Sequence, residues 1–172
     1  MELAKAIKSR RSIRSFTPDV VDDSVIRKII EFGNLAPSAG NLQPRDFIVV
    51  KDKNIKFKLA QAALDQHFVY EAPVVIVVCA NLQRAAPYGS RGKELYCIQD
   101  SAAAAENMLL AIVDFGLASC WVGAFNEKAV SEVLGLPSHV RPVALLPVGH
   151  PKEQVKSSYR INLTELIHWD SW

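Results

Sequence analysis

Four residues near the N-terminus have side chains that bind anions. Arg10, Arg11 and Arg14 bring three guanidinium groups into a span of five residues, and Ser12 adds a hydroxyl between them. A guanidinium matches a phosphate or carboxylate with two parallel hydrogen bonds, which makes arginine the preferred side chain at such sites. The heptad Arg10–Phe16 (RRSIRSF) is therefore a candidate for a compact anion site.

Two simpler interpretations of the heptad also agree with the sequence. A cluster of arginines is more often a solvated basic surface, and composition alone favours that reading. Contact with nucleic-acid phosphate is the other, but the formal net charge of +2 is too small to indicate such a partner. No wider basic stripe or aromatic platform accompanies the cluster. We therefore expect no nucleic-acid partner.

No motif for side-chain catalysis accompanies the heptad. The chain has no GxGxxG after a strand pattern, no GxxxxGK[ST] and no GxSxG. The histidines, His67, His139, His150 and His168, are isolated and lack metal-binding spacing. If the protein is an enzyme, a cofactor other than a metal would carry the chemistry.

The segment Gln99–Phe125 is the predicted centre of the fold. Ser101–Phe115 is rich in helix formers and almost entirely apolar, which predicts a buried helix that Asp100 or Ser101 caps. Leu117–Phe125 is short, apolar and contains glycine, as expected of a buried strand that ends against a ligand.

The remaining pattern alternates helices and strands, which predicts one layered α/β or α+β domain over residues 1–172. Helices are predicted at Glu2–Ser9, after Asp22 or Asp23, after Asp52, and after Asn126; strands at Asp46–Lys51, Val74–Ala80 and Arg141–Val148; and surface loops at Pro37–Pro44 and Asn81–Glu94. The prolines at Pro142 and Pro147 suggest the two ends of a strand near a sheet margin.

Composition suggests a cytoplasmic protein with no membrane segment. The chain is 49% hydrophobic and 22% charged, and its N-terminus lacks the apolar core of a signal peptide. Three cysteines without paired spacing are typical of a reducing compartment. Trp169 and Trp172 end the chain, and large apolar rings at a terminus need a surface to dock on.

The heptad is the first of four motifs that lie in order along nearly the whole chain, and the second is Ala36–Pro44 (APSAGNLQP). The third is Tyr96–Asp100 with Gly116–Phe125, and the fourth is Gly149–Pro151 with Arg160. Together these motifs resemble those of the nitroreductase family of flavoproteins.

This resemblance implies an α+β homodimer with a three-layer fold, in which helices flank a central mixed sheet and the C-terminal tail docks on the partner. It implies FMN at the subunit interface. By family pattern, Arg10, Arg11, Ser12 and Arg160 would hold the phosphate and ribityl chain, and Arg14 would lie near N1 and the C2 carbonyl of the ring. The partner would contribute Pro37, Ser38, Ala39 and Asn41, while Trp121, Val122 and Gly123 would line the ring, with a backbone N–H donating to N5. The plainer alternatives are core packing for Trp121 and a β-bulge for Gly123.

The activity that the resemblance implies is hydride transfer from NAD(P)H through FMN to a small electrophile, such as a nitroaromatic or a quinone. Reductive dehalogenation, flavin breakdown, and flavin storage or redox sensing are the alternatives. Larger family members place an asparagine and a lysine at the pyrimidine edge, which this chain lacks; Gln66 is a candidate substitute. Asn81–Glu94, with Arg84, Tyr88, Arg91 and Lys93, is the candidate lid.

Overall fold

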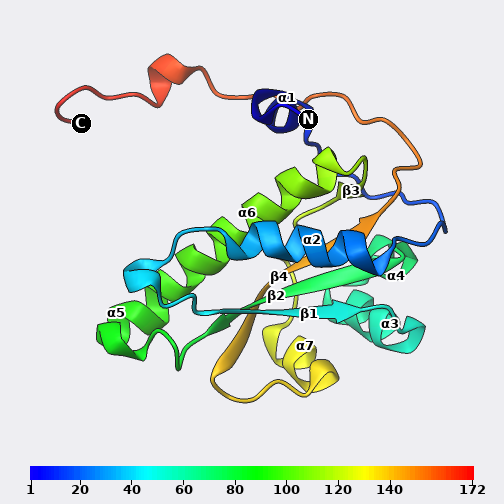
Figure 1. The fold of residues 1–172 in the computed structure, drawn as a ribbon, viewed down its shortest axis with the longest axis horizontal. Helices are drawn as coiled ribbons and strands as arrows, with labels where there is room; N and C mark the ends of the chain where they lie inside the picture. Colours follow the sequence, from blue (N-terminus) through cyan, green and yellow to red (C-terminus); the bar gives the residue numbers. More distant parts are fainter.

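A four-stranded sheet forms the middle of the protein in the computed structural model, which describes residues 1–172 (Figure 1). Its strands run in the order β1–β2–β4–β3 and every neighbouring pair is antiparallel. The only parallel pairing is a single bridge between Ser12 and Ser119, which adds the heptad to the edge beside β3. The strands are β1 Arg45–Val50, β2 Val74–Asn81, β3 Ala118–Ser119 and β4 Val140–Gly149.

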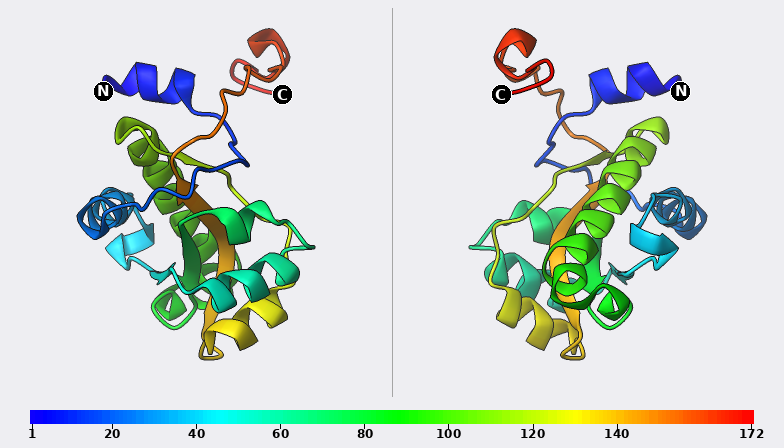
Figure 2. Two further views of the ribbon diagram at one scale, coloured as in Figure 1. Left: turned by 90° about the vertical axis from the view of Figure 1, so that its right-hand side faces the viewer. Right: turned by 90° about the vertical axis from the view of Figure 1, so that its left-hand side faces the viewer.

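Helices cover both faces of this sheet, which confirms the expected three layers (Figure 2). Every residue of β2 is buried, as its run of β-branched residues predicted. Val74, Ile76 and Val78 pack in the cluster that includes residues of α2 (Asp23–Asn34) and α6 (Cys97–Asp114). The alternate side chains of β2 pack with α3 (Lys53–Ala62) and α7 (Glu127–Leu134) on the other face.

Helix α6 starts earlier than its sequence pattern predicted, and its predicted caps are wrong. It begins at Cys97, directly after the π-helical turn η3 (Gly92–Tyr96), and no side chain caps it. Asp100 and Ser101 therefore lie within the helix rather than at its start. Asp100 instead accepts a hydrogen bond from the backbone N–H of Ala39. The predicted caps Asp22, Asp52 and Asn126 are confirmed by hydrogen bonds from the helices that they precede.

The strand predicted over Leu117–Phe125 is much shorter in the structure. The pairing of Ala118 with Gly149 and of Ser119 with Val148 sets a register that puts Cys120 opposite Pro147. Pro147 has no N–H to donate, so the ladder stops at Ser119 and resumes only as a bridge between Val122 and Leu145. The residues after Ser119 consequently leave the regular sheet.

Strand β4 also corrects the prediction made from its prolines. It runs through both Pro142 and Pro147 and lies between β2 and β3, not at a margin. Pro142 falls at an irregularity where the register of β2 with β4 shifts between Val78 and Cys79. The sheet therefore accommodates each missing N–H at a local break in one of its ladders.

The remaining elements are short. They are α1 Leu3–Ser9, η1 Ala39–Asn41, α4 Phe68–Glu71, η2 Ala86–Tyr88, α5 Gly89–Arg91 and η4 Leu163–Glu165. The predicted loop Asn81–Glu94 is thus a series of tight helical turns. No helix combines the length and the apolar character that crossing a bilayer requires.

The C-terminal tail leaves the body of the protein. Every residue from Pro151 to Trp172 is exposed, and the tail runs past α1 and away from the sheet (Figure 1). Trp169 is 83% exposed and Trp172 is 100% exposed. The terminal tryptophans are therefore not packed against the body of their own subunit.

Gly149→Ala tests how tightly the heptad is packed on the sheet. A Cβ at Gly149 would lie 2.7 Å from Cδ of Pro73 and 3.1 Å from Cδ1 of Phe16. Because Pro73 is rigid, we expect the substitution to displace Phe16 and lower the free energy of unfolding by roughly 1–3 kcal/mol. Urea unfolding of the apoprotein measures this change in the free energy of unfolding. Gly123→Ala is the control, since its Cβ would meet nothing closer than 3.5 Å, and equal losses in both variants would contradict the packing argument.

Candidate functional site

The heptad is held by its backbone and by two buried side chains. Ile13 donates its N–H to the carbonyl of Ser119 at 3.0 Å, and Phe16 forms a bridge with Pro151. Ile13 and Phe16 pack with Ala72 and Ala118 in a small cluster of their own. This anchoring leaves the polar side chains of the heptad at the surface beside β3.

The arginines of the heptad have no carboxylate partner. None of Arg10, Arg11 and Arg14 takes part in an ion pair. Arg11 folds back and donates to the carbonyls of Lys8 and Arg10, both at 2.7 Å. Arg14 lies over the ring of Phe68, 5.9 Å from its centroid. The positive charge of this cluster is therefore uncompensated within the chain, as an anion site requires.

Cys120 marks where the heptad meets the third motif. Its thiol is buried, and burial raises its pKa. Arg14, Ser12 and Arg10 oppose that rise, so these three side chains lie close enough to Cys120 to influence its thiol. A thiol with a raised pKa is a poor nucleophile, which fits a packing role for Cys120.

The segment Trp121–Ala124 runs from this point with unused backbone donors. Val122 is buried, and its N–H donates to the carbonyl of Leu145 at 3.0 Å. The N–H groups of Trp121, Gly123 and Ala124 have no acceptor in the chain, and the Trp121 side chain is 38% exposed. Val122, one of the three predicted ring-lining residues, thus has its side chain in the core and its N–H bonded to Leu145. Neither group is available to a ligand.

Gln66 supports this segment. Its side-chain amide donates to the carbonyl of Ala63 at 2.8 Å and to that of Ala124 at 3.1 Å. Gln66 therefore ties the turn after α3 to the residue that follows Gly123. Its amide hydrogens are used within the chain, and only its oxygen remains to meet a ligand.

The proline–serine loop has a strained backbone that internal hydrogen bonds hold in place. Gly40, Asn41 and Gln43 all have positive φ angles of 55°, 55° and 49°. The hydroxyl of Ser38 accepts the N–H of Gln43 at 3.0 Å. A Cβ at Gly40 would lie 2.5 Å from the Tyr88 hydroxyl, so glycine is needed there for space as well as for its φ angle.

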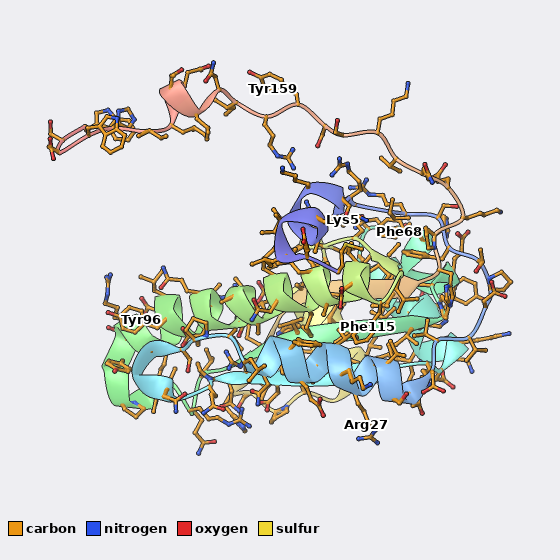
Figure 3. All side chains as sticks on the ribbon, turned by 45° about the horizontal axis from the view of Figure 1, so that its top comes forward. Lys5, Arg27, Phe68, Tyr96, Phe115 and Tyr159 are labelled. Atoms are coloured by element: carbon orange, nitrogen blue, oxygen red, sulfur yellow. The ribbon has the colours of Figure 1, made fainter.

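Helix α6 separates this loop from the heptad. The loop is bound to Asp100 near the start of α6, whereas the heptad pairs with Ser119, just beyond its end. The rise from Asp100 to Asp114 is about 20 Å at 1.5 Å per residue. Figure 3 shows the same separation, with Tyr96 at one end of the molecule and Phe68, which Arg14 overlies, toward the other. One chain therefore does not bring together all the predicted site residues.

Arg160 is also apart from the heptad. It lies in the exposed tail, and its guanidinium donates only to the Ser158 hydroxyl and the Tyr159 carbonyl. Among the candidate lid residues, Arg84 is occupied by Asp46 and by the carbonyls of Gln43 and Arg45.

Asp100 and Arg45 are the polar residues of the site region that sequence reasoning missed. Both are buried and both bind the backbone around the proline–serine loop. Asp100 was interpreted as a helix cap, and Arg45 precedes the predicted strand without a motif of its own. The available signals were that Asp100 is part of the third motif and that Arg45 directly follows the second.

Comparison with known proteins decides the family. The family model described as "Nitroreductase family" matches residues 7–150, which is most of the chain. The protein belongs to the nitroreductase family. An NADH dehydrogenase of Thermus thermophilus is 32% identical over 98% of this chain and 96% of its own length. An FMN reductase (NADPH) of Bacillus subtilis is 32% identical over 98% of this chain and 73% of its own.

Solved structures support the same assignment. The NADPH:FMN oxidoreductase of Vibrio harveyi, solved in complex with NAD+, superposes with a TM-score of 0.92 at 29% identity. The match covers 99% of this chain and 77% of the Vibrio chain. The matches thus cover nearly the whole of the Thermus relative and about three quarters of each flavin reductase.

Ser119→Ala tests whether the buried hydroxyl of Ser119, beside the heptad, lowers the stability of the protein. The Ser119 hydroxyl is the one buried side-chain polar atom without a hydrogen-bond partner. Removing an unsatisfied buried hydroxyl relieves its desolvation cost, so we expect the free energy of unfolding to rise by about 1 kcal/mol. Ser101→Ala is the matched control, because that buried hydroxyl reaches two carbonyls and its loss is expected to destabilise. Denaturant unfolding of the apoproteins measures both, and destabilisation by Ser119→Ala would show that its hydroxyl has a partner.

Proposed function

We propose that this nitroreductase reduces small electrophiles, such as quinones and nitroaromatics, at a flavin held between two copies of the chain. The observation that carries the proposal is the uncompensated arginine cluster beside a segment with free backbone N–H donors. The family and its relatives make the chain an FMN-dependent oxidoreductase with NAD(P)H as electron donor.

The chemistry of the heptad and the third motif fits FMN. A phosphate needs positive charge and hydroxyl donors, which Arg10 and Ser12 offer without competition from a carboxylate. A flat ring with polar edges needs an apolar surface and N–H donors, which Trp121 and Gly123 offer. When bound, FMN supplies the hydride chemistry that no side chain of this protein provides.

Each group of residues then has a distinct task in the proposed site. Arg10 and Ser12, with Arg11, retain the phosphate and ribityl chain. Arg14 stabilises the negative charge that reduction leaves on the ring, and a backbone N–H of Trp121–Ala124 orients the reactive edge.

The separation along α6 supports a site built from two copies. A second copy could supply Pro37, Ser38, Ala39 and Asn41 to the flavin held by the first copy's heptad, which the same chain's loop is too distant to reach. An apolar groove of about 310 Å³ between α1, α2 and α6 and the exposed tryptophans of the tail favour an extensive interface. Strand β1 is also an edge of the sheet with no strand on its outer side.

Arg10→Ala and Arg14→Ala should have different effects on the flavin. Phosphate carries the same charge in both redox states, so Arg10→Ala is expected to weaken FMN retention and leave the midpoint potential of the bound flavin nearly unchanged. Arg14→Ala removes a cation that favours the reduced ring, so it is expected to lower the potential. A charged contact of about 1.5–3 kcal/mol corresponds to several tens of millivolts, because 30 mV is about 1.4 kcal/mol for two electrons.

Spectroelectrochemical titration of the two holoproteins measures this difference, with wild type as reference. A lowered potential in Arg10→Ala and weak flavin binding in Arg14→Ala would reverse the two assignments.

Deleting Ile167–Trp172 should weaken both the dimer and its flavin. The deleted residues include two tryptophans that contact no part of the body in their own chain. Sedimentation across a concentration series and FMN titration measure the two effects. The double substitution Trp169→Ala and Trp172→Ala separates loss of the rings from loss of chain length. A deletion variant that remains dimeric with unchanged FMN affinity would exclude the tail from the interface.

The reaction itself is tested by anaerobic titration with NADH and NADPH, followed by a panel of acceptors. Fast bleaching of the flavin and recolouring by a quinone or nitroaromatic is the expected result. Turnover of a halogenated aromatic alone would indicate reductive dehalogenation, and slow bleaching with no turnover would indicate storage or sensing.

A further inference from the structure

A buried pair of opposite charges lies beneath the proline–serine loop. Asp100 is 9% exposed and Arg45 is 4% exposed. Asp100 projects from α6, whereas Arg45 is the first residue of β1. Their charges attract one another, which favours the ionised form of each against the cost of burial.

Arg45 binds the chain that leads into the loop. Its Nη2 donates to the carbonyl of Asn34 at 2.7 Å and to that of Ala36 at 2.8 Å, and its Nη1 donates to the carbonyl of Pro37 at 3.3 Å. These carbonyls follow the end of α2, where the helix leaves its last acceptors unpaired. One guanidinium thus fixes the course of the backbone from α2 to Pro37.

Asp100 binds the next part of the loop. Both of its carboxylate oxygens accept the N–H of Ala39, at 3.2 and 3.1 Å. Ala39 begins the turn in which Gly40 and Asn41 have left-handed backbone angles. A strained turn persists only where its surroundings hold it, and Asp100 holds it at its first residue.

Burying these two opposite charges adds little net stability, because the cost of desolvating them offsets the attraction between them. The two side chains instead bind four backbone groups between Asn34 and Ala39, on the chain that leads into a loop whose tip is exposed. We propose that Asp100 and Arg45 are positioning residues that set the geometry of the loop for the flavin bound to the partner copy. The inference rests on the proposed function, since it concerns the same two-copy site.

Asp100→Ala tests the pair. It removes both the acceptor for Ala39 and the partner of Arg45, so we expect the dissociation constant for FMN to rise roughly 10- to 100-fold. Asp100→Asn keeps one acceptor oxygen without the charge, and we expect an intermediate loss. Glu132→Gln is the control for removal of one negative charge, because Glu132 is exposed on α7 far from the loop, and its affinity should equal that of wild type.

A mixed dimer separates positioning from general damage to the fold. Chains carrying Asp100→Ala and Arg10→Ala, with different affinity tags, are co-expressed and the mixed species is purified. One of its sites then combines the intact heptad of the Asp100→Ala chain with the intact loop of the Arg10→Ala chain. We expect one FMN per mixed dimer to bind with wild-type affinity, although both parent homodimers bind weakly.

The outcomes are distinct. Unchanged FMN affinity in Asp100→Ala and Asp100→Asn would overturn the inference. A mixed dimer without a site of wild-type affinity would also overturn it, because Asp100 would then affect the site of its own chain. A wild-type protein that is monomeric or fails to bind FMN would contradict the proposed function itself. If Asp100→Ala does not fold, the Asp100→Asn homodimer and its mixed dimer decide the result.

Discussion

The length and position of α6 constrain the rest of the structure. Its alanine-rich stretch lets α2 and the sheet approach closely, and Ala104, Ala105, Met108 and Ile112 are fully buried there. The helix is therefore a rigid spacer. The proline–serine loop is bound near its start and the heptad lies beyond its end, and the helix rises about 20 Å between Asp100 and Asp114. The two motifs of one chain are therefore held at opposite ends of α6.

Pro147 interrupts the pairing of β3 with β4 beside the candidate ligand surface. Had β3 continued in register beyond Ser119, the backbone of Cys120 would have bonded to β4. Pro147 opposite Cys120 prevents this, so the chain detaches for two residues and reattaches at Val122. Trp121 and Gly123 flank Val122, which bonds to Leu145, so their own N–H groups point away from β4 and remain free. Gln66 then holds the far side of the segment through the carbonyl of Ala124.

The buried charges of the protein act on backbone groups rather than on one another alone. Arg45 donates hydrogen bonds to carbonyls at and just after the end of α2, and Asp100 accepts one from the N–H of Ala39. Lys56, also buried, donates to the carbonyl of Ala72, which packs beneath the heptad. Burial lowers the pKa of Lys56, and the carbonyl contact compensates its buried donor. In each case a charged side chain holds a segment of backbone outside the regular helices and strands, next to a candidate ligand surface.

The sequence by itself determined the layered fold, its buried central strand and the family. The β-branched run Val74–Ala80, the caps at Asp22, Asp52 and Asn126, and the four ordered motifs are local features, and local chemistry is visible in a sequence. The roles of Asp100 and Arg45, the end of β3 at Ser119 and the central place of β4 were decided by the tertiary structure. Each depends on a residue distant in the chain: Ala39 for Asp100, Pro147 for Cys120, and two neighbouring strands for β4. Spacing along one chain cannot predict such pairings, because they are set by how the layers pack.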